Sequence, residues 1–293
     1  MSGTVLCVGA LSLDTIFRFD TLPTTPGKHL PREIVQVSQG MATAQAASIV
    51  RLGGKAKLWA SIGDDDTADR ILADLKAARI DISAIRRVAG AASGFASIFM
   101  DANGERIIAP HYDPALRSAP DTLPSLEGIT AVSVDVRWPD AAEMALRAAR
   151  EHWIPGVLDV EIAPIDVLER LLPLATHIVA SEHGARHFTG LPPAEAADAL
   201  RRRYMVEVIV TAGERGIFWR GENIPAFAIN AVDTLAAGDV FHGAFALGLT
   251  EGWQTDVAIR FASAAAAIKC TRFGGRLGAP TRKEVATFLA RLA

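Results

Sequence analysis

The sequence has few cysteines, no long hydrophobic run and no large excess of charge of one sign, and each absence excludes a class of protein. Cys7 and Cys270 both fall in apolar runs, so we expect buried thiols rather than a zinc site or the disulfides of a secreted protein. No apolar segment is long enough to span a bilayer, and no charged-then-apolar leader precedes the first strand pattern. The net charge of −3 provides no basic surface for nucleic acid. We therefore expect a cytoplasmic protein with neither membrane nor nucleic-acid partners.

Half of the 293 residues are hydrophobic, which is enough for one large α/β domain or two small ones. From residue 129 onward, short apolar segments alternate with helical patterns, which predicts strands at 131–136, 157–160, 177–180 and 206–211. This alternation is typical of βαβ units and therefore of a mostly parallel sheet. Because the sequence contains neither an internal repeat nor a linker, we predict a single domain over residues 1–293.

The segment 231–249, AVDTLAAGDVFHGAFALGL, has the pattern of a strand end, a turn of small residues and a buried helix. Ala236, Ala237 and Gly238 carry no bulk, so a ligand can approach the main chain there. The first amides of a helix lack partners within the helix and lie at the positive end of its dipole, which favours a phosphate. Asp239 beside such a site is explained if it takes the proton from a hydroxyl that attacks the phosphate. The alternative is a Gly/Ala-rich helix that packs closely on a sheet.

The run 233–243, DTLAAGDVFHG, resembles the signature DTxGAGDxFxxG of the PfkB (ribokinase-like) carbohydrate kinases, with Ala236 in place of the first glycine. The resemblance implies a three-layer α/β/α sandwich with a central, mostly parallel sheet and a small β-sheet lid. It also implies transfer of the γ-phosphoryl group of ATP to a sugar hydroxyl. Magnesium would bridge the ATP phosphates, and Asp239 would be the base.

Two segments, about 15–37 and 94–110, alternate apolar and polar residues and are expected to supply the lid strands. Asn103-Gly104 predicts a tight hairpin within the second segment. In the family such strands cover the sugar and often pair with a second subunit, so the resemblance implies a homodimer through the lid. A closed lid would expel the water that competes with the sugar as phosphoryl acceptor.

Asp14 follows the strand expected at 5–8, at the edge where open α/β sheets place their ligands. The resemblance implies that Asp14 accepts hydrogen bonds from sugar hydroxyls; the alternative is an aspartate that caps a turn. Gln39 and Gly40 begin a helix that faces the pocket. The family usually has Gly-Gly at these positions and an Asn a few residues on, where this chain has Gln39 and Ala44. The side chain of Gln39 is expected to protrude towards the sugar.

The segment 211–216, TAGERG, resembles the family's TxGxxG turn on the nucleotide side. The resemblance also implies that the Ala-rich helix at 258–270 and the loop after it wall the adenine, and that nearby backbone oxygens and Asp233 can hold a monovalent cation such as K⁺. The residues expected to contact ATP are Thr211, Gly213, Gly216, Gly238, Gly274 and Gly275.

Two acidic stretches are candidates for metal binding. Asp64-Asp65-Asp66 would either bind a metal or cap the helix that follows, and we favour the cap. Much of the family has Asn-x-x-Glu to organise magnesium through water, where this chain has Ser181-Glu182-His183-Gly184. Glu182 is expected to replace the missing acid in part.

Stretches spread over nearly the whole chain resemble one branch of the family, the bacterial sulfofructose kinases, which phosphorylate 6-deoxy-6-sulfofructose at its 1-hydroxyl. These stretches are residues 26–28, 104–108, 135–138, 269–272 and 274–276. A sulfonate is a permanent anion, to which Arg137 at a strand end would donate a fork of hydrogen bonds and Lys28 would add charge from the lid. The alternatives are that Arg137 pairs with Asp135 or with another acid nearby, and that Lys28 is a solvated turn residue.

Other functions remain open on the sequence alone. The acceptor is alternatively another ketose, ribose, deoxyketogluconate or a nucleoside. A non-catalytic sugar or nucleotide sensor on the same fold is motivated by the departures at Gln39, Ala44, Ala236 and Gly184. A dinucleotide-binding enzyme is disfavoured because no GxGxxG follows the first strand.

Overall fold

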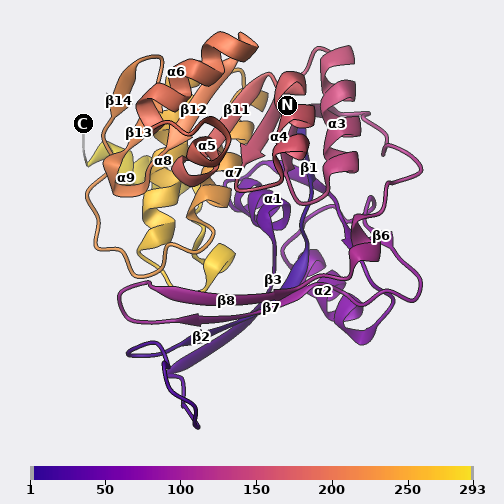
Figure 1. Cartoon of the computed structure of the whole chain (residues 1–293), viewed down its shortest axis with the longest axis vertical. Helices are drawn as coiled ribbons and strands as arrows, with labels where there is room; N and C mark the ends of the chain where they lie inside the picture. Colours follow the sequence, from indigo (N-terminus) through magenta and orange to yellow (C-terminus); the bar gives the residue numbers. More distant parts are fainter. Residues whose placement is uncertain (1–2, 292–293) are drawn as a thin grey trace.

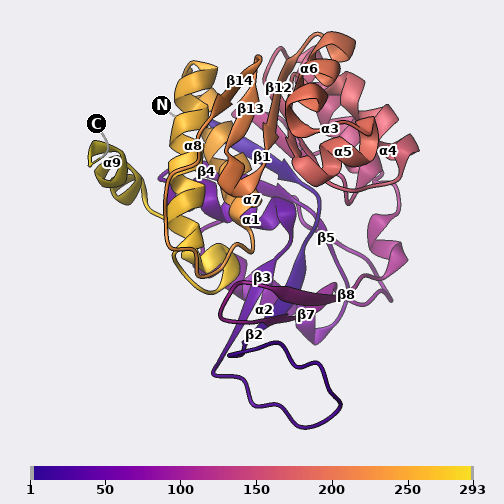
Figure 2. The ribbon, with the colours of Figure 1, turned by 60° about the vertical axis from the view of Figure 1, so that its left-hand side comes forward.

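The computed structural model describes residues 3–291, and its centre is an eight-stranded sheet with helices on both faces (Figures 1 and 2). The strand order is β14-β13-β12-β11-β10-β9-β1-β4; the six strands from β12 to β4 run parallel, and β13 and β14 are added antiparallel at one edge. The bounds of these strands are β1 (Thr4–Val8), β4 (Lys55–Trp59), β9 (Ile129–Asp135), β10 (Gly156–Val160), β11 (His177–Ser181), β12 (Glu207–Thr211), β13 (Ile217–Trp219) and β14 (Glu222–Ile224).

Side chains of the parallel strands alternate between two hydrophobic cores, one on each face of the sheet. In β1, Val5 and Cys7 belong to one core, and Leu6 and Val8 belong to the other. Both faces are apolar because helices cover both of them. The first core is completed by α1 (Met41–Arg51), α2 (Asp66–Ala77), α7 (Ala237–Thr250), α8 (Thr255–Cys270) and α9 (Arg282–Ala290). The second is completed by α3 (Pro139–Glu151), α4 (Ile165–Leu171), α5 (Glu182–Thr189) and α6 (Pro193–Tyr204).

A separate four-stranded sheet, which we call the lid, lies beside the central sheet (Figure 1). Its strands, in spatial order, are β3 (Glu33–Gln39), β2 (Ser12–Arg18), β7 (Phe95–Met100) and β8 (Arg106–His111). Ile16, Ile98 and neighbouring apolar residues of the lid pack against Leu235 and Phe273 of the main body. The segment between β2 and β3 projects away from the body (Figure 2). The remaining short elements are β5 (Ser61–Ile62), β6 (Arg86–Arg87) and 3₁₀ helices at Pro114–Arg117, Leu172–Leu174, Gly213–Arg215 and Gly275–Gly278.

The predicted α/β sandwich with a mostly parallel sheet and a small separate sheet is confirmed, but the strand expected before the turn at 233–238 is wrong. Residues 225–236 are irregular. The amides of Val232 and Asp233 donate to the carbonyl of Cys270 at the end of α8, at 2.7 and 3.1 Å. Because a helix terminus satisfies these amides, no neighbouring strand is needed.

Two smaller expectations concern cysteines and membrane segments. Cys7 is buried as expected, whereas Cys270 is only partly buried. Among residues 3–291, no helix is both long enough and apolar enough to cross a membrane.

Candidate active site

Helix α7 begins with amides that point into open space. The amide of Ala237 donates to the Thr234 carbonyl at 3.2 Å, but the amides of Gly238 and Asp239 meet no acceptor within residues 3–291. A Cβ atom built on Gly238 would have no heavy atom within 4 Å. Ala236 enters the helix in the left-handed conformation, φ 62°. Free donors at the positive end of a helix dipole can bind an anion, and binding of a phosphate at this turn stays a prediction.

The carboxylate of Asp239 lies in the same helical turn and is partly exposed. Its pKa is raised well above the usual range, chiefly because it is poorly solvated and also because it faces the negative charge of Asp159; His242 acts in the opposite direction. A carboxylate whose pKa is raised is a stronger base than a free one, which suits removal of a proton from a hydroxyl.

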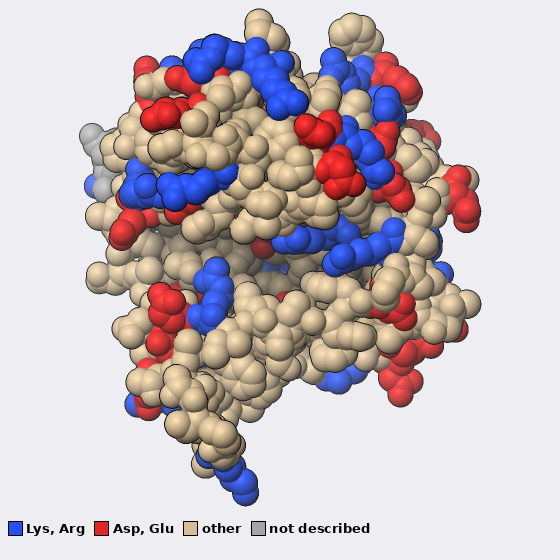
Figure 3. Space-filling model, in the orientation of Figure 1, with Lys and Arg blue, Asp and Glu red and all other residues tan. Residues whose placement is uncertain are grey.

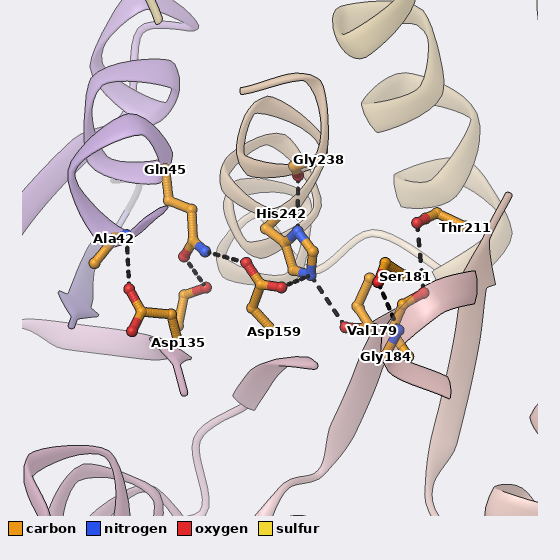
Figure 4. Close-up of polar contacts among 12 residues, drawn as sticks. Ala42, Gln45, Asp135, Asp159, Val179, Ser181, Gly184, Thr211, Gly238 and His242 are labelled. Atoms are coloured by element: carbon orange, nitrogen blue, oxygen red, sulfur yellow. Dashed lines mark hydrogen bonds and ion pairs between the residues drawn. The ribbon is translucent and has the colours of Figure 1, made fainter. Parts of the chain in front are cut away.

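A chain of polar side chains ties the start of α7 to the sheet (Figure 4). Ser133 donates to Gln45 Oε1 at 2.7 Å, and Gln45 Nε2 donates to Asp159 at 2.9 Å. The second oxygen of Asp159 lies 3.3 Å from His242 Nε2. The other ring nitrogen of His242 lies 2.7 Å from the Gly238 carbonyl oxygen. The chain therefore fixes the turn that carries Gly238 and Asp239.

Asp135 accepts a hydrogen bond from the start of a second helix, α1. It is fully buried at the end of β9, and one of its oxygens accepts from the amides of Ala10 and Ala42 at 2.8 and 3.0 Å. Ala42 is in the first turn of α1, so Asp135 supplies the negative charge that this helix start favours. Burial raises the pKa of Asp135, and these hydrogen bonds oppose the rise.

Asp14 and Gly40 lie where the lid joins the body. Asp14 is on β2, is 6% exposed and accepts a hydrogen bond from Ser12 Oγ at 2.7 Å. Burial raises its pKa to about 6. Gly40 precedes α1 with φ 109°, and a Cβ there would lie 2.3 Å from the Ala10 carbonyl oxygen, so only glycine fits. Contact of either residue with a sugar stays a prediction.

Gln39 is buried at the end of β3 rather than at the start of the helix, and within residues 3–291 its Oε1 meets no hydrogen-bond donor. It is 4% exposed, and its Nε2 lies 2.6 Å from the position of a Cβ built on Gly275. Ala44 is buried in α1. The amide of Gln39 therefore packs beside the loop that follows α8, and its contact with a sugar stays a prediction.

Arg137 follows β9 and lines a small cavity of about 30 Å³ together with Ser61, Tyr112 and Arg117. Its Nη1 donates to the Ile162 carbonyl at 3.0 Å, and only its backbone amide contacts Asp135, at 2.7 Å. Within residues 3–291 its guanidinium forms no ion pair with Asp135 or with another acid, so that alternative is wrong. Lys and Arg side chains lie around the hollow between lid and body (Figure 3).

The glycines expected on the nucleotide side fall into two groups. Thr211 ends β12, and Gly213 and Gly216 follow it with φ of 57° and 90°. The amides of Gly274 and Gly275 instead donate to Asp233 Oδ2, both at 3.0 Å. Those two amides therefore hold the turn before α7, and nucleotide contact by any of these residues stays a prediction.

The expected metal ligands have other partners. Asp65 caps α2 by accepting from the Ala68 amide at 2.8 Å, which confirms the capping interpretation of Asp64-Asp65-Asp66. Glu182 forms an ion pair with Arg215. A Cβ at Gly184 would lie 2.3 Å from the Val160 carbonyl oxygen, so an acid cannot stand there on this backbone. Within the described residues, no group of three or more His, Cys, Asp or Glu side chains could hold a metal ion.

Sequence reasoning missed several residues of this site. Arg106 of lid strand β8 donates to Thr234 Oγ1 at 2.8 Å, which places a cation of the lid against the turn before α7. Lys269 is fully buried against Asp233. The sequence feature that could have indicated Lys269 is a lysine within an Ala-rich helix. No local sequence pattern indicates the polar contacts among Gln45, Asp159 and His242.

Comparison with known proteins agrees with this geometry. The profile of the pfkB family carbohydrate kinases matches residues 2–282. The ribokinase of Bacillus subtilis is 28% identical over 295 residues, covering 98% of this chain and 99% of the relative. A candidate ribokinase from Agrobacterium tumefaciens has a crystal structure that superposes with a TM-score of 0.97 at 43% identity, covering 100% of this chain and 99% of that one. The ribokinase of Arabidopsis thaliana, complexed with ribose and ATP, shares the fold with a TM-score of 0.82 at 22% identity, covering 99% of each chain.

Proposed function

This chain belongs to the PfkB family of carbohydrate kinases and is an ATP-dependent carbohydrate kinase, and on that premise we propose that its acceptor is a small sugar with an anionic group. The leading candidate is 6-deoxy-6-sulfofructose, phosphorylated at its 1-hydroxyl. The observation that carries the proposal is the pair of guanidinium groups, Arg137 and Arg117, that line one cavity beyond the ends of β1 and β9.

The charges around this cavity favour an anion. Nη1 of Arg137 donates one hydrogen bond to the Ile162 carbonyl. Among the described residues the other N–H groups of the guanidinium have no acceptor, so they are able to donate to a ligand. Arg117 stacks on the ring of Tyr112, 5.2 Å from its centroid. An arginine pair and a phenol offer the planar, multiple donors that a three-oxygen anion accepts. The stretch 135–138 is also among those that resemble the sulfofructose kinases. Lys28, exposed on the segment that projects from the lid, is proposed to add charge when the lid closes.

The reaction follows from the groups around α7. The sugar hydroxyl lies between Asp14 and Asp239, and Asp239 accepts its proton as the oxygen attacks the γ-phosphorus. The bond from the γ-phosphorus to the β–γ bridging oxygen breaks, and ADP leaves with that oxygen. The free amides of Gly238 and Asp239 hold the phosphoryl oxygens, where charge is redistributed in the transition state. Bound magnesium would supply positive charge to the ATP phosphates, and Glu182 is the acid nearest in type to the family's metal organiser, although it is paired with Arg215. The lid keeps water away from the phosphoryl group.

An ADP-forming assay with a panel of acceptors tests the proposal. The panel contains 6-deoxy-6-sulfofructose, fructose, ribose, deoxyketogluconate and a nucleoside. We expect sulfofructose to give the highest kcat/KM. Arg137→Ala should raise its KM about ten- to a hundredfold, which is the loss of one or two charged hydrogen bonds, and leave fructose little changed. Arg147→Ala is the control, because Arg147 pairs with Glu143 on the outer side of α3.

Three outcomes would contradict the proposal. A preference for ribose would favour the activity for which several relatives are named. An equal loss for every sugar in Arg137→Ala would assign Arg137 a structural role. Stabilisation by sugars without any ADP formation would indicate a sensor.

A further inference from the structure

Lys269 is a charged side chain with no exposed surface. It lies in the last turn of α8, and its Nζ donates to the Asp233 carbonyl at 2.6 Å and lies 3.0 Å from Asp233 Oδ2. Taking an ammonium ion out of water is costly unless oxygen acceptors replace the water. The position of this charge therefore requires an explanation beyond packing.

Asp233 joins three segments around the phosphate-binding turn. One of its carboxylate oxygens accepts from the Leu235 amide, within the turn itself. The other accepts from the amides of Gly274 and Gly275 and from Lys269. The amide of Asp233 reaches the end of α8 at Cys270. Movement of Asp233 would displace the turn that presents the amides of Gly238 and Asp239.

The donors around Asp233 leave no oxygen of this residue free for a monovalent cation. Its carbonyl oxygen and both carboxylate oxygens already have donors: the ammonium of Lys269 and three amides. A potassium ion at the carboxylate would meet the ammonium at close range, and two like charges in a site without water repel strongly. The residues present do not fit a second cation at Asp233.

We propose that the ammonium of Lys269 is a built-in substitute for a monovalent cation beside the phosphate-binding turn, so that this kinase does not need potassium. The ammonium carries the same single charge, and α8 delivers it to the oxygens that a free ion would contact. Lys269 is then a positioning residue: it acts on the reaction through Asp233 and the turn. The proposal rests on the kinase function, but not on the identity of the sugar.

The first experiment measures ADP binding by the intact wild-type protein with magnesium chloride present, in potassium, sodium or choline chloride at one ionic strength. We expect the same affinity and the same thermal midpoint in all three salts. A clear gain in ADP affinity or thermal midpoint that is specific to potassium would overturn the proposal. No acceptor sugar is used, so failure of the sulfofructose proposal would leave this result unaffected.

The second experiment compares two variants that remove the charge. Lys269→Ala leaves space for an ion, and Lys269→Met fills that space. We expect ADP affinity in choline to fall about ten- to a hundredfold in both, as for a lost charged hydrogen bond. Potassium or ammonium chloride should restore binding and raise the thermal midpoint of Lys269→Ala alone. Lys57→Ala is the control, since Lys57 lies on β4 and pairs with Asp81 rather than with a residue of the turn before α7.

A purely structural role would weaken both variants without rescue by any cation, and that result would overturn the proposal. Normal ADP binding by Lys269→Ala in choline would do the same. If both variants fail to fold, the comparison of salts on the wild-type protein decides the question.

Discussion

At the scale of single residues, the carboxylates differ in what their surroundings do to their charge. Burial raises the pKa of Asp14, and poor solvation raises that of Asp239. Hydrogen bonds to Ser83 and the charge of Lys57 instead lower the pKa of Asp81. Raised values cost stability at neutral pH, so proteins keep them where the chemistry needs them. The pKa of Asp135 is raised as well, but its carboxylate is occupied by backbone amides. Removal of Asp14 or Asp239 is therefore the change that should separate stability from activity.

Asp239→Asn should lower kcat about 10²–10⁴-fold, the range for loss of a positioned base. Binding of ADP should be nearly unchanged, because the amides of Gly238 and residue 239 remain. A coupled assay gives kcat, and calorimetry gives the ADP affinity. Asp256→Asn is the matched control, an exposed acid in the first turn of α8. Near-normal turnover of Asp239→Asn would exclude Asp239 as the base.

Asp14 should make stability and activity respond to pH in opposite directions. Its pKa is about 6 in the folded chain, against an ordinary value of 3.8 for an exposed aspartate, so the folded state binds more protons between these values. The free energy of unfolding therefore falls as pH rises from about 4 to 6, by about 3 kcal/mol for this group. Sugar binding should strengthen over the same range, because an ionised carboxylate is the better acceptor.

The variant Asp14→Asn removes this titration. We expect a higher free energy of unfolding than wild type at pH 7.5 and a raised KM for the sugar. Urea unfolding at about pH 5 and 7.5 measures the first, and initial rates measure the second. Asp81→Asn should do the opposite to stability, since its charge is favoured by its neighbours. Equal stability changes at both pH values in Asp14→Asn would contradict the assignment.

The free amides at the start of α7 could be predicted from the sequence, because they depend on neighbours within one turn: Ala236, Ala237, Gly238 and Asp239. Their contact with a phosphate stays a prediction. The sequence could not predict partners that meet only through the fold. Gln45 and Asp159 are 114 positions apart, and no local pattern relates them. The same limit explains why the ion pair of Asp233 with Lys269, 36 positions away, was not predicted.

At the scale of elements, α2 offers a direct test of the capping interpretation. Asp65 accepts from the Ala68 amide, and also from the amide and hydroxyl of Ser93 at 2.8 and 2.6 Å. Asp65→Ala should lower the free energy of unfolding by about 1–2 kcal/mol, since it removes a cap and leaves Ser93 without its acceptor. Chemical denaturation measures the change.

Asp66→Ala is the control for this prediction, because Asp66 is in the first turn of the same helix without capping it. Its loss should cost a few tenths of a kcal/mol through the helix dipole. Equal effects of the two substitutions would mean that the run of acids acts through its charge. A metal-dependent midpoint would revive the metal interpretation.

The apolar runs predicted five parallel strands of the main sheet, β1, β9, β10, β11 and β12, to within a few residues, because each of these strands is apolar on both faces. The prediction failed at 231–232, where Val232 looks like a strand residue but its amide pairs with Cys270 at a helix end. The sequence pattern cannot show which partner a backbone amide finds, so this irregular segment was missed.

At the scale of the whole molecule, the lid has an apolar row on the face away from the body. In the register of the four strands, Ile34, Phe17, Phe99 and Ile107 are direct neighbours in that order. The rings of Phe17 and Phe99 stack at 5.3 Å, and Ile34 and Ile107 are 56% and 48% exposed. The opposite face, with Ile98, is buried against the body. Exposed apolar rows on a sheet are usually covered by a partner.

We therefore predict a homodimer in which this row meets a second copy of the chain. Replacing Ile34 and Ile107 together by Glu should give the mass of a monomer in light scattering, because burial of two carboxylates without partners outweighs the remaining contact. Met205→Glu is the control, since Met205 is 85% exposed on the main body and should leave the mass unchanged. A lid that needs its partner to stay closed would also lose sugar affinity in the double variant. A dimer that persists in the double variant would place the interface elsewhere. A monomeric wild-type protein would show that this row makes no contact with a second copy.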